Sequence, residues 1–126
     1  MSLRVFVADD HPLWRDALIA DLVAAGYDVV GSAADGPSTV RRVKATVPEV
    51  LLLDLNLPGL HGADVCAQVA GLATRVLILS ASGEEGDVLA ALKAGASGYL
   101  VKSATPQEIR SAVAATGRGE ATFTPG

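Results

Sequence analysis

The stretch VLLLDLNLPGLHG (residues 50–62) decides how this chain can fold. Four apolar residues without polar alternation run into one acid, Asp54, and a loop with Asn56, Pro58 and Gly59 follows. A short apolar run of this kind is typical of a strand covered on both faces, as in a parallel sheet flanked by helices. Such a strand would hold the Asp54 carboxylate rigidly at its carboxyl end, beside a loop that a ligand can approach.

Similar apolar runs recur along the chain and alternate with helical patterns. Strands are predicted at residues 3–8, 27–33, 49–54, 75–80 and 98–101. Helices are predicted at residues 12–26, 37–47, 62–70, 84–95 and 105–117. The last helix carries a capping-box pattern, with Thr105 as N-cap, Pro106 at the first position and Glu108 three residues after the cap. This alternation predicts an α/β fold, (βα)5, with a doubly wound parallel sheet of five strands.

Polar residues stand at the carboxyl ends of four predicted strands: Asp9 and Asp10, Asp54, Ser80 and Lys102. Ligands of doubly wound sheets bind outside these ends, where the strand order reverses. Carboxylates gathered there repel one another unless a cation neutralises them, and hard oxygen ligands suit Mg²⁺. A lysine suits a phosphate. The set therefore predicts a site for phosphoryl transfer, with a carboxylate as the nucleophile.

Each of these residues alone has an ordinary structural explanation. An aspartate at a strand end is often a cap or a turn former, and Asp9 or Asp10 could cap the helix that starts at Pro12. Lys102 alone would be a solvated surface lysine, and Ser80 a turn hydroxyl. The functional interpretation rests on all of them sharing one edge of the sheet.

The composition limits the class of protein. The chain has 126 residues, one ordinary domain, of which 50% are hydrophobic, and its net charge is −4. The chain lacks the overall positive charge that is typical of proteins that bind nucleic acid. The single cysteine, Cys66, excludes an internal disulfide and favours a reducing compartment. No apolar run approaches the roughly 20 residues that span a bilayer. We therefore expect a soluble, cytoplasmic protein with no membrane partner.

Four motifs, in this order and spacing, resemble the receiver domain of bacterial two-component response regulators. They are VADDHPLWRDAL (7–18), LLLDLNLPGLHG (51–62), LILSAS (77–82) and GASGYLVKSATPQEI (95–109). The DDHP start and the KSATPQEI end look like the NarL/FixJ (LuxR-type) subfamily. The resemblance implies a flavodoxin-like sheet with strand order 2-1-3-4-5. It also implies a receiver over residues 1–117, followed at 118–126 by the start of a linker to a helix-turn-helix DNA-binding domain.

The resemblance implies a role for each matching residue. Asp54 would accept a phosphoryl group from a sensor histidine kinase. Asp9, Asp10, Asp54 and the Asn56 backbone carbonyl would bind Mg²⁺. On phosphorylation, Ser80 would move toward the phosphoryl group, which Lys102 also contacts, and Tyr99 would turn inward. The face formed by the fourth helix, fifth strand and fifth helix would then change and control an output domain, in the family usually one for transcription. A homodimer on phosphorylation is left open.

Some positions depart from the family's commonest pattern. His61 stands where an acid is frequent and is interpreted as a solvated loop residue. His11, beside the acidic pair, is interpreted as a solvated first-turn residue, with tuning of the pocket's charge as the alternative. Trp14 is interpreted as core packing, with a dimer contact as the alternative. Ser103 follows Lys102 where many receivers have proline after a cis bond. Asn56 and Ser82 stand at the positions that influence the lifetime of the aspartyl phosphate.

Other functions remain as alternatives. The main one is a degenerate receiver that works as a phosphorylation-independent interaction module, against which the complete set of site residues argues. A flavin-binding electron carrier would want a phosphate-cradling loop after the first strand, where this chain has DDHP. A phosphatase of the aspartyl-phosphate type would want an acid at position 56. The chain is expected to catalyse only its own phosphorylation and dephosphorylation, so it is not an enzyme in the usual sense.

Overall fold

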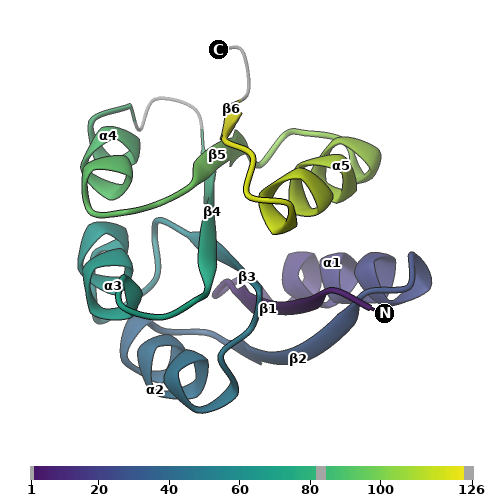
Figure 1. The fold of residues 1–126 in the computed structure, drawn as a ribbon, viewed down its shortest axis with the longest axis horizontal. Coiled ribbons are helices and arrows are strands. Elements are labelled where there is room, and N and C mark those ends of the chain that lie inside the picture. Colours follow the sequence, from purple (N-terminus) through teal and green to yellow (C-terminus); the bar gives the residue numbers. More distant parts are fainter. Residues whose placement is uncertain (1, 82–84, 124–126) are drawn as a thin grey trace.

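A computed structural model describes residues 2–81 and 85–123 of the chain (Figure 1). Strands and helices alternate from the N-terminus. The strands are β1 (Arg4–Ala8), β2 (Asp28–Ala33), β3 (Val50–Asp54), β4 (Arg75–Ser80), β5 (Gly98–Val101) and β6 (Thr122–Phe123). The helices are α1 (Pro12–Ala24), α2 (Gly36–Thr46), α3 (Gly62–Val69), α4 (Glu85–Lys93) and α5 (Pro106–Gly117).

The strands form one parallel sheet in the order β2-β1-β3-β4-β5-β6. This confirms the predicted (βα)5 alternation and the order 2-1-3-4-5. The sheet nevertheless has one strand more than the five predicted, because Thr122 and Phe123 pair with Gly98 and Tyr99 at the edge of β5. The sequence pattern predicts a linker for this segment, since a strand of two residues leaves no periodicity to detect. Residues 124–126 lie outside the described part of the chain.

Two layers of helices cover the sheet, with α2, α3 and α4 on one face and α1 and α5 on the other (Figure 1). The β3 side chains alternate between the two apolar cores. Leu51 and Leu53 belong to the core under α2, α3 and α4, whereas Val50 and Leu52 belong to the core under α1 and α5. All four are fully buried. This double burial explains why the strand has no polar residue before Asp54.

The loop that follows β3 is held by the start of α2. Asp35 caps that helix by accepting a hydrogen bond from the Ser38 backbone N–H at 2.7 Å. The Gly36 backbone N–H donates to the Pro58 carbonyl at 2.8 Å. Gly59 adopts a φ of +90°, and a Cβ there would lie 2.8 Å from the Pro37 ring. The glycine therefore allows the loop to lie close against α2.

None of the helices in the described residues is long and apolar enough to cross a membrane.

Candidate functional site

The register of the sheet brings the carboxyl ends of β1, β3 and β4 to one level. Ala8 pairs with Leu53, so Asp9 and Asp54 follow at the same height on neighbouring strands. Asp54 pairs with Leu79 on β4, and Ser80 pairs with the last residue of β5, after which Lys102 follows. The residues predicted from the strand ends therefore do meet at one edge of the sheet.

The acids of the site differ in burial. Asp9 and Asp54 are almost completely enclosed, with 0% and 1% of their surfaces exposed. Asp10 is half-buried, yet its Oδ1 atom is buried and accepts no hydrogen bond. The Asn56 backbone N–H donates to Asp54 Oδ1 at 3.1 Å. Buried carboxylates of this kind are costly unless cations or hydrogen bonds compensate them.

Lys102 supplies the first compensating charge. Its Nζ atom lies 2.6 Å from Asp9 Oδ2 and 3.1 Å from Asp54 Oδ2. The same ammonium group sits 4.6 Å from the centroid of the Trp14 ring, within the range of a cation–π contact. The Lys102 backbone N–H donates to the Ser80 carbonyl at 2.8 Å, which continues the ladder between β4 and β5. Lys102 is thus held at its backbone by β4 and at its ammonium group by the two buried acids.

His11 also enters the site, in agreement with the alternative that its place beside the acidic pair left open. Its side chain is 62% exposed, as expected for a solvated residue, but its Nδ1 atom lies 3.0 Å from Asp9 Oδ1 and 3.2 Å from Lys102 Nζ. His11 directly follows the two acids in the sequence, which places its backbone near the site. Nothing in the residue pattern showed that the ring would fold back over them.

These contacts shift the pKa values of the three buried groups. Burial raises the pKa of Asp54 above its ordinary value, and the contacts with Asn56 and Lys102 only partly oppose this. Burial also acts against the charged form of Asp9, but hydrogen bonds from Lys102 and from the His11 backbone outweigh it, so the pKa of Asp9 is lowered. The pKa of Lys102 is raised, because the two carboxylates outweigh its burial. The ion pair between Asp9 and Lys102 therefore stays charged at neutral pH.

Ser80 and Tyr99 lie on the other face of the sheet from Asp54. The β4 residues alternate, and Ile78 belongs to the core under α3 and α4, so Ser80 faces the same way. Tyr99 is half-buried and packs against that same core, and it pairs with Ile78. The two predicted switch residues therefore share one face, with Ser80 at the carboxyl end of β4 and Tyr99 near the start of β5.

The remaining predicted positions lie around this edge. Asn56 is exposed in the loop after β3, and His61 is exposed at the N-cap of α3, where it makes no side-chain cap bond. Ser82 lies outside the described residues. The described residues contain no cis peptide bond, so the Lys102–Ser103 bond is trans. Trp14 is only partly buried, packing against the core under α1 and α5.

The acidic group has the composition of a cation site. Ligand atoms of Asp9, Asp10, His11 and Asp54 all lie within 4.8 Å of one another. The buried Asp10 Oδ1, which accepts no hydrogen bond, is the kind of atom that a bound cation satisfies. Carboxylate oxygens are the ligands that Mg²⁺ prefers, so the residues present fit this ion.

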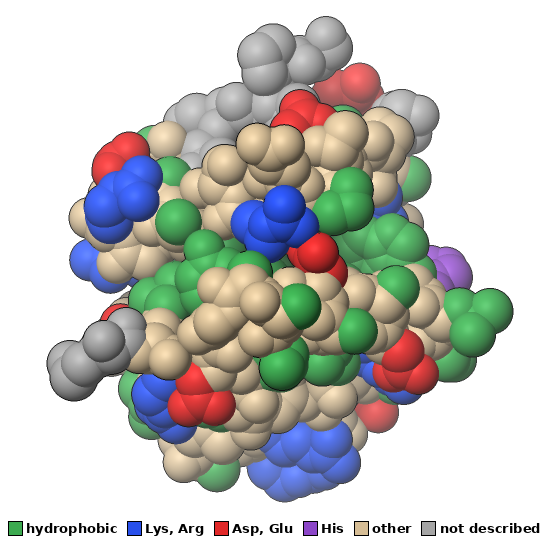
Figure 2. Space-filling model, turned by 90° about the vertical axis from the view of Figure 1, so that its right-hand side faces the viewer, with side chains coloured by type: hydrophobic (Ala, Val, Ile, Leu, Met, Phe, Trp, Pro, Cys, Tyr) green, Lys and Arg blue, Asp and Glu red, His purple; other side chains and the backbone are tan. Residues whose placement is uncertain are grey.

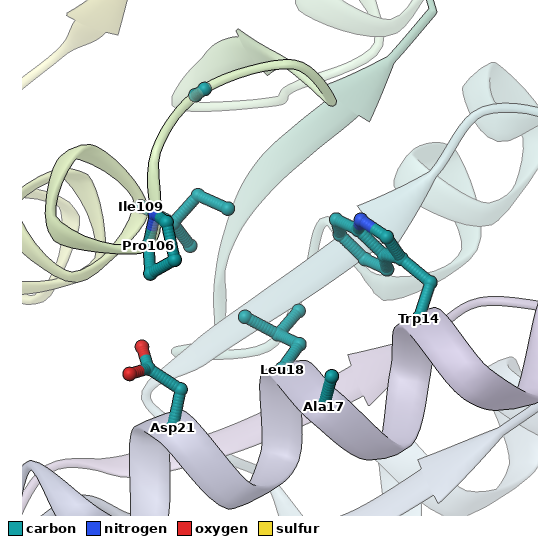
Figure 3. Close-up of a pocket in the computed structure, with 7 residues that line it drawn as sticks. Trp14, Ala17, Leu18, Asp21, Pro106 and Ile109 are labelled. Atoms are coloured by element: carbon teal, nitrogen blue, oxygen red, sulfur yellow. The ribbon is translucent and has the colours of Figure 1, made fainter.

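An apolar groove opens beside the site, between α1 and α5. Figure 2 shows this face of the molecule, on which hydrophobic side chains gather. The groove has a volume of about 200 Å³ and is lined by Trp14, Ala17, Leu18, Asp21, Ala104, Pro106 and Ile109. In Figure 3, the side chains of α1 rise toward Pro106 and Ile109 of α5. An ion pair between Arg110 and Asp21, at 2.7 Å, ties the two helices together.

Comparison with known proteins agrees with this geometry. The sequence pattern of the response regulator receiver domain matches residues 5–114. The chain belongs to this family. It is 43% identical to the "Probable transcriptional regulatory protein NarL" of Mycobacterium tuberculosis (strain ATCC 25618 / H37Rv), over 98% of this chain and 59% of the relative. It is 34% identical to the nitrate/nitrite response regulator protein NarL of Escherichia coli (strain K12), over 92% of this chain and 55% of the relative.

Solved structures show the same receiver fold. The signal receiver domain of NarL from Mycobacterium tuberculosis superposes with a TM-score of 0.90 at 43% identity, covering 94% of this chain and 98% of that one. A LuxR-family response regulator from Aurantimonas sp. SI85-9A1 has a TM-score of 0.86 at 34% identity, with coverages of 98% and 90%. The receiver therefore belongs among the NarL/LuxR-type regulators. The chain spans little more than half the length of the curated relatives named above.

Proposed function

We propose that this receiver is a phosphorylation-controlled switch in which Asp54 accepts a phosphoryl group from a sensor histidine kinase. The observation that carries the proposal is the buried Asp54 carboxylate at the sheet edge, with Lys102 Nζ 3.1 Å away and Asp9 and Asp10 beside it. A buried carboxylate with a raised pKa is weakly solvated, which favours its attack on phosphorus.

In the transfer, an Asp54 carboxylate oxygen forms a bond to the phosphorus of a phosphohistidine. The N–P bond breaks, and its electron pair stays on the imidazole of the kinase. Asp9, Asp10, Asp54 and the Asn56 carbonyl would hold Mg²⁺, which when bound neutralises charge on the phosphoryl oxygens. Lys102 is placed to exchange its contact with Asp54 for one with a phosphoryl oxygen. In this proposal the chain promotes only its own phosphorylation and dephosphorylation and is not an enzyme in the usual sense.

The phosphoryl group would act on the opposite face through Ser80 and Tyr99. Ser80 is almost fully buried at the end of β4, and Tyr99 is packed against the same core. Movement of Ser80 toward the phosphoryl group would let Tyr99 turn inward, which changes the surface made by α4, β5 and α5. A local change of charge would thereby shift a two-state element.

The relatives suggest the wider setting. Both curated relatives named above are regulators, the one from Mycobacterium tuberculosis named as transcriptional, so we propose that the receiver domain, residues 1–117, controls a DNA-binding output domain in the cytoplasm. We also propose that phosphorylation promotes a homodimer at the apolar groove between α1 and α5. The alternative of a phosphorylation-independent interaction module is less well supported, because the five expected groups at the sheet edge are all present.

Beryllofluoride tests this proposal, since with Mg²⁺ it binds a phosphoacceptor carboxylate as a phosphoryl mimic. Trp14 lies against Lys102 and is the only tryptophan, so its fluorescence reports the site. We expect a saturable fluorescence change that needs both Mg²⁺ and beryllofluoride and is absent in Asp54→Asn. Sedimentation of the same samples reports self-association. If the fluorescence of wild type does not change, as expected for Asp54→Asn, the proposal is contradicted.

A further inference from the structure

His11 occupies a place in the acidic site that the proposed switch mechanism does not use. Its Nδ1 atom lies 3.0 Å from Asp9 Oδ1, 3.2 Å from Asp10 Oδ1 and 3.8 Å from Asp54 Oδ2. A single ring nitrogen therefore faces all three carboxylates of the site.

The backbone fixes His11 in this position. Its N–H donates to Asp9 Oδ1 at 2.7 Å, and Pro12 begins α1 directly afterwards. His11 stands at the N-cap of α1, but its side chain makes no capping hydrogen bond. The ring is therefore not used to cap the start of the helix, and its Nδ1 atom lies beside the acids. Substitution of the side chain should leave the helix start intact.

We propose that His11 is a ligand of the divalent cation in this site, and that its nitrogen gives the site a preference for transition ions such as Co²⁺ over Mg²⁺. This rests on the proposed function, which places a cation among Asp9, Asp10 and Asp54. The ligand atoms of these three acids and the His11 ring nitrogen all lie within 4.8 Å of one another, so one cation could contact all four residues. Oxygen ligands alone suit Mg²⁺, whereas imidazole favours later first-row transition ions.

A competing explanation makes His11 only a partner of the carboxylates when the cation is absent. Because Nδ1 also lies 3.2 Å from Lys102 Nζ, the ring could simply share the charge of the site. Any cation would then have to displace the ring. This explanation predicts that removing the imidazole tightens the binding of Co²⁺ and Mg²⁺ to a similar extent. The two explanations thus differ in the sign and in the ion selectivity of the effect.

Isothermal titration calorimetry with Co²⁺ and with Mg²⁺ separates these explanations. The proteins are wild type, His11→Asn, His11→Ala and the matched control His61→Asn, which changes the other histidine of the chain. We expect both His11 variants to lose at least about tenfold in Co²⁺ affinity. Their Mg²⁺ affinity should change by no more than about twofold, and His61→Asn should match wild type. Equal changes for the two ions, or no change for either, would overturn the proposal.

Direct ligation has its own spectroscopic signature. With Co²⁺ bound, wild type should show a hyperfine-shifted imidazole N–H proton resonance that is missing in His11→Asn and kept in His61→Asn. The variant Asp10→Asn separates the acidic cation site from the role of His11. If Asp10→Asn weakens the binding of both ions while His11→Asn alters the binding of neither, the acidic cation site stands and the role of His11 is wrong. If wild type binds neither ion, both the role of His11 and the cation step of the proposed function are wrong.

Discussion

At the residue scale, the site depends on how each charged group is surrounded. Asp9 and Asp54 are equally buried, yet their pKa values move in opposite directions. Each accepts one backbone N–H and contacts Lys102, but the contacts of Asp9 are shorter, 2.7 Å and 2.6 Å, whereas both contacts of Asp54 are 3.1 Å. At Asp54 the longer contacts offset less of the effect of burial, so its pKa stays raised. We therefore expect Asp54 to be the more reactive carboxylate and Asp9 to hold the lysine in place.

These roles were only partly accessible from the sequence. The positions of Asp9, Asp54 and Lys102 could be predicted, because strand ends in a parallel sheet meet at one edge. The contacts of His11 and of Trp14 with Lys102 could not. They depend on side-chain rotamers over the rim, for which neither spacing nor hydrophobic pattern carries a signal.

Val47 offers a prediction about stability at a single residue. It ends α2 with a φ of 43°, in the left-handed region, which is costly for a β-branched side chain. The Val47 backbone N–H donates to the Val43 carbonyl, and the Val47 carbonyl accepts from the Arg4 guanidinium. Neither hydrogen bond involves the Val47 side chain. We expect Val47→Gly to raise the free energy of unfolding by about 0.5–1 kcal/mol, since relief of strain exceeds the added chain entropy.

Urea denaturation followed by circular dichroism measures this change. Val47→Ala is the control, because it shortens the side chain but keeps the Cβ atom, so its gain should be smaller. A Val47→Gly protein less stable than wild type would show that the lost apolar contact outweighs the strain.

At the scale of elements, the helix starts hold the loops around the site. Asp35 caps α2 and accepts from both the N–H and the hydroxyl of Ser38. Thr105 and Glu108 form the capping box predicted for α5, which follows the Lys102 loop. The predicted strands and helices match the observed ones to within a residue or two, because their apolar periods and caps are strong. Only β6 was missed, as its two residues pair through backbone groups that the residue pattern does not encode.

The Asp35 cap predicts a pH dependence of stability. The hydrogen bond from the Ser38 backbone lowers the pKa of Asp35 below its ordinary 3.8. A carboxyl with a depressed folded-state pKa stabilises the fold above its unfolded pKa, and the contribution is lost as the pH falls through the folded value. Wild type should therefore be more stable than Asp35→Ala at neutral pH, and the difference should shrink as the pH falls below about 3.8.

Urea unfolding of both proteins at a series of pH values tests this dependence. Asp35→Asn provides the control, because asparagine also caps helices but does not titrate. Its advantage over Asp35→Ala should stay constant across the series. A wild-type advantage that is equally constant would show that the Asp35 charge does not contribute.

At the scale of the whole molecule, the sheet separates the acidic site from the two proposed switch residues. By the alternation of side chains along a strand, Asp54 faces the same way as Leu52, toward the core under α1 and α5, and Ser80 faces the opposite way, with Ile78. Tyr99 packs against the core that contains Ile78. At the carboxyl ends of β3 and β4 the two sets of residues come together, since Asp54 pairs with Leu79, next to Ser80. The fold class and strand order could be predicted from alternation and family resemblance. The sixth strand beside Tyr99, which extends the sheet at the edge of β5, had to come from the structure.

The most direct test of the central claim is the intact mass of the protein after incubation with acetyl phosphate and Mg²⁺. Wild type should gain one phosphoryl group, about 80 Da, and the gain should disappear in Asp54→Asn and in a sample with chelator. The same gain in Asp54→Asn, or none in wild type, would contradict the assignment of Asp54 as the phosphoacceptor.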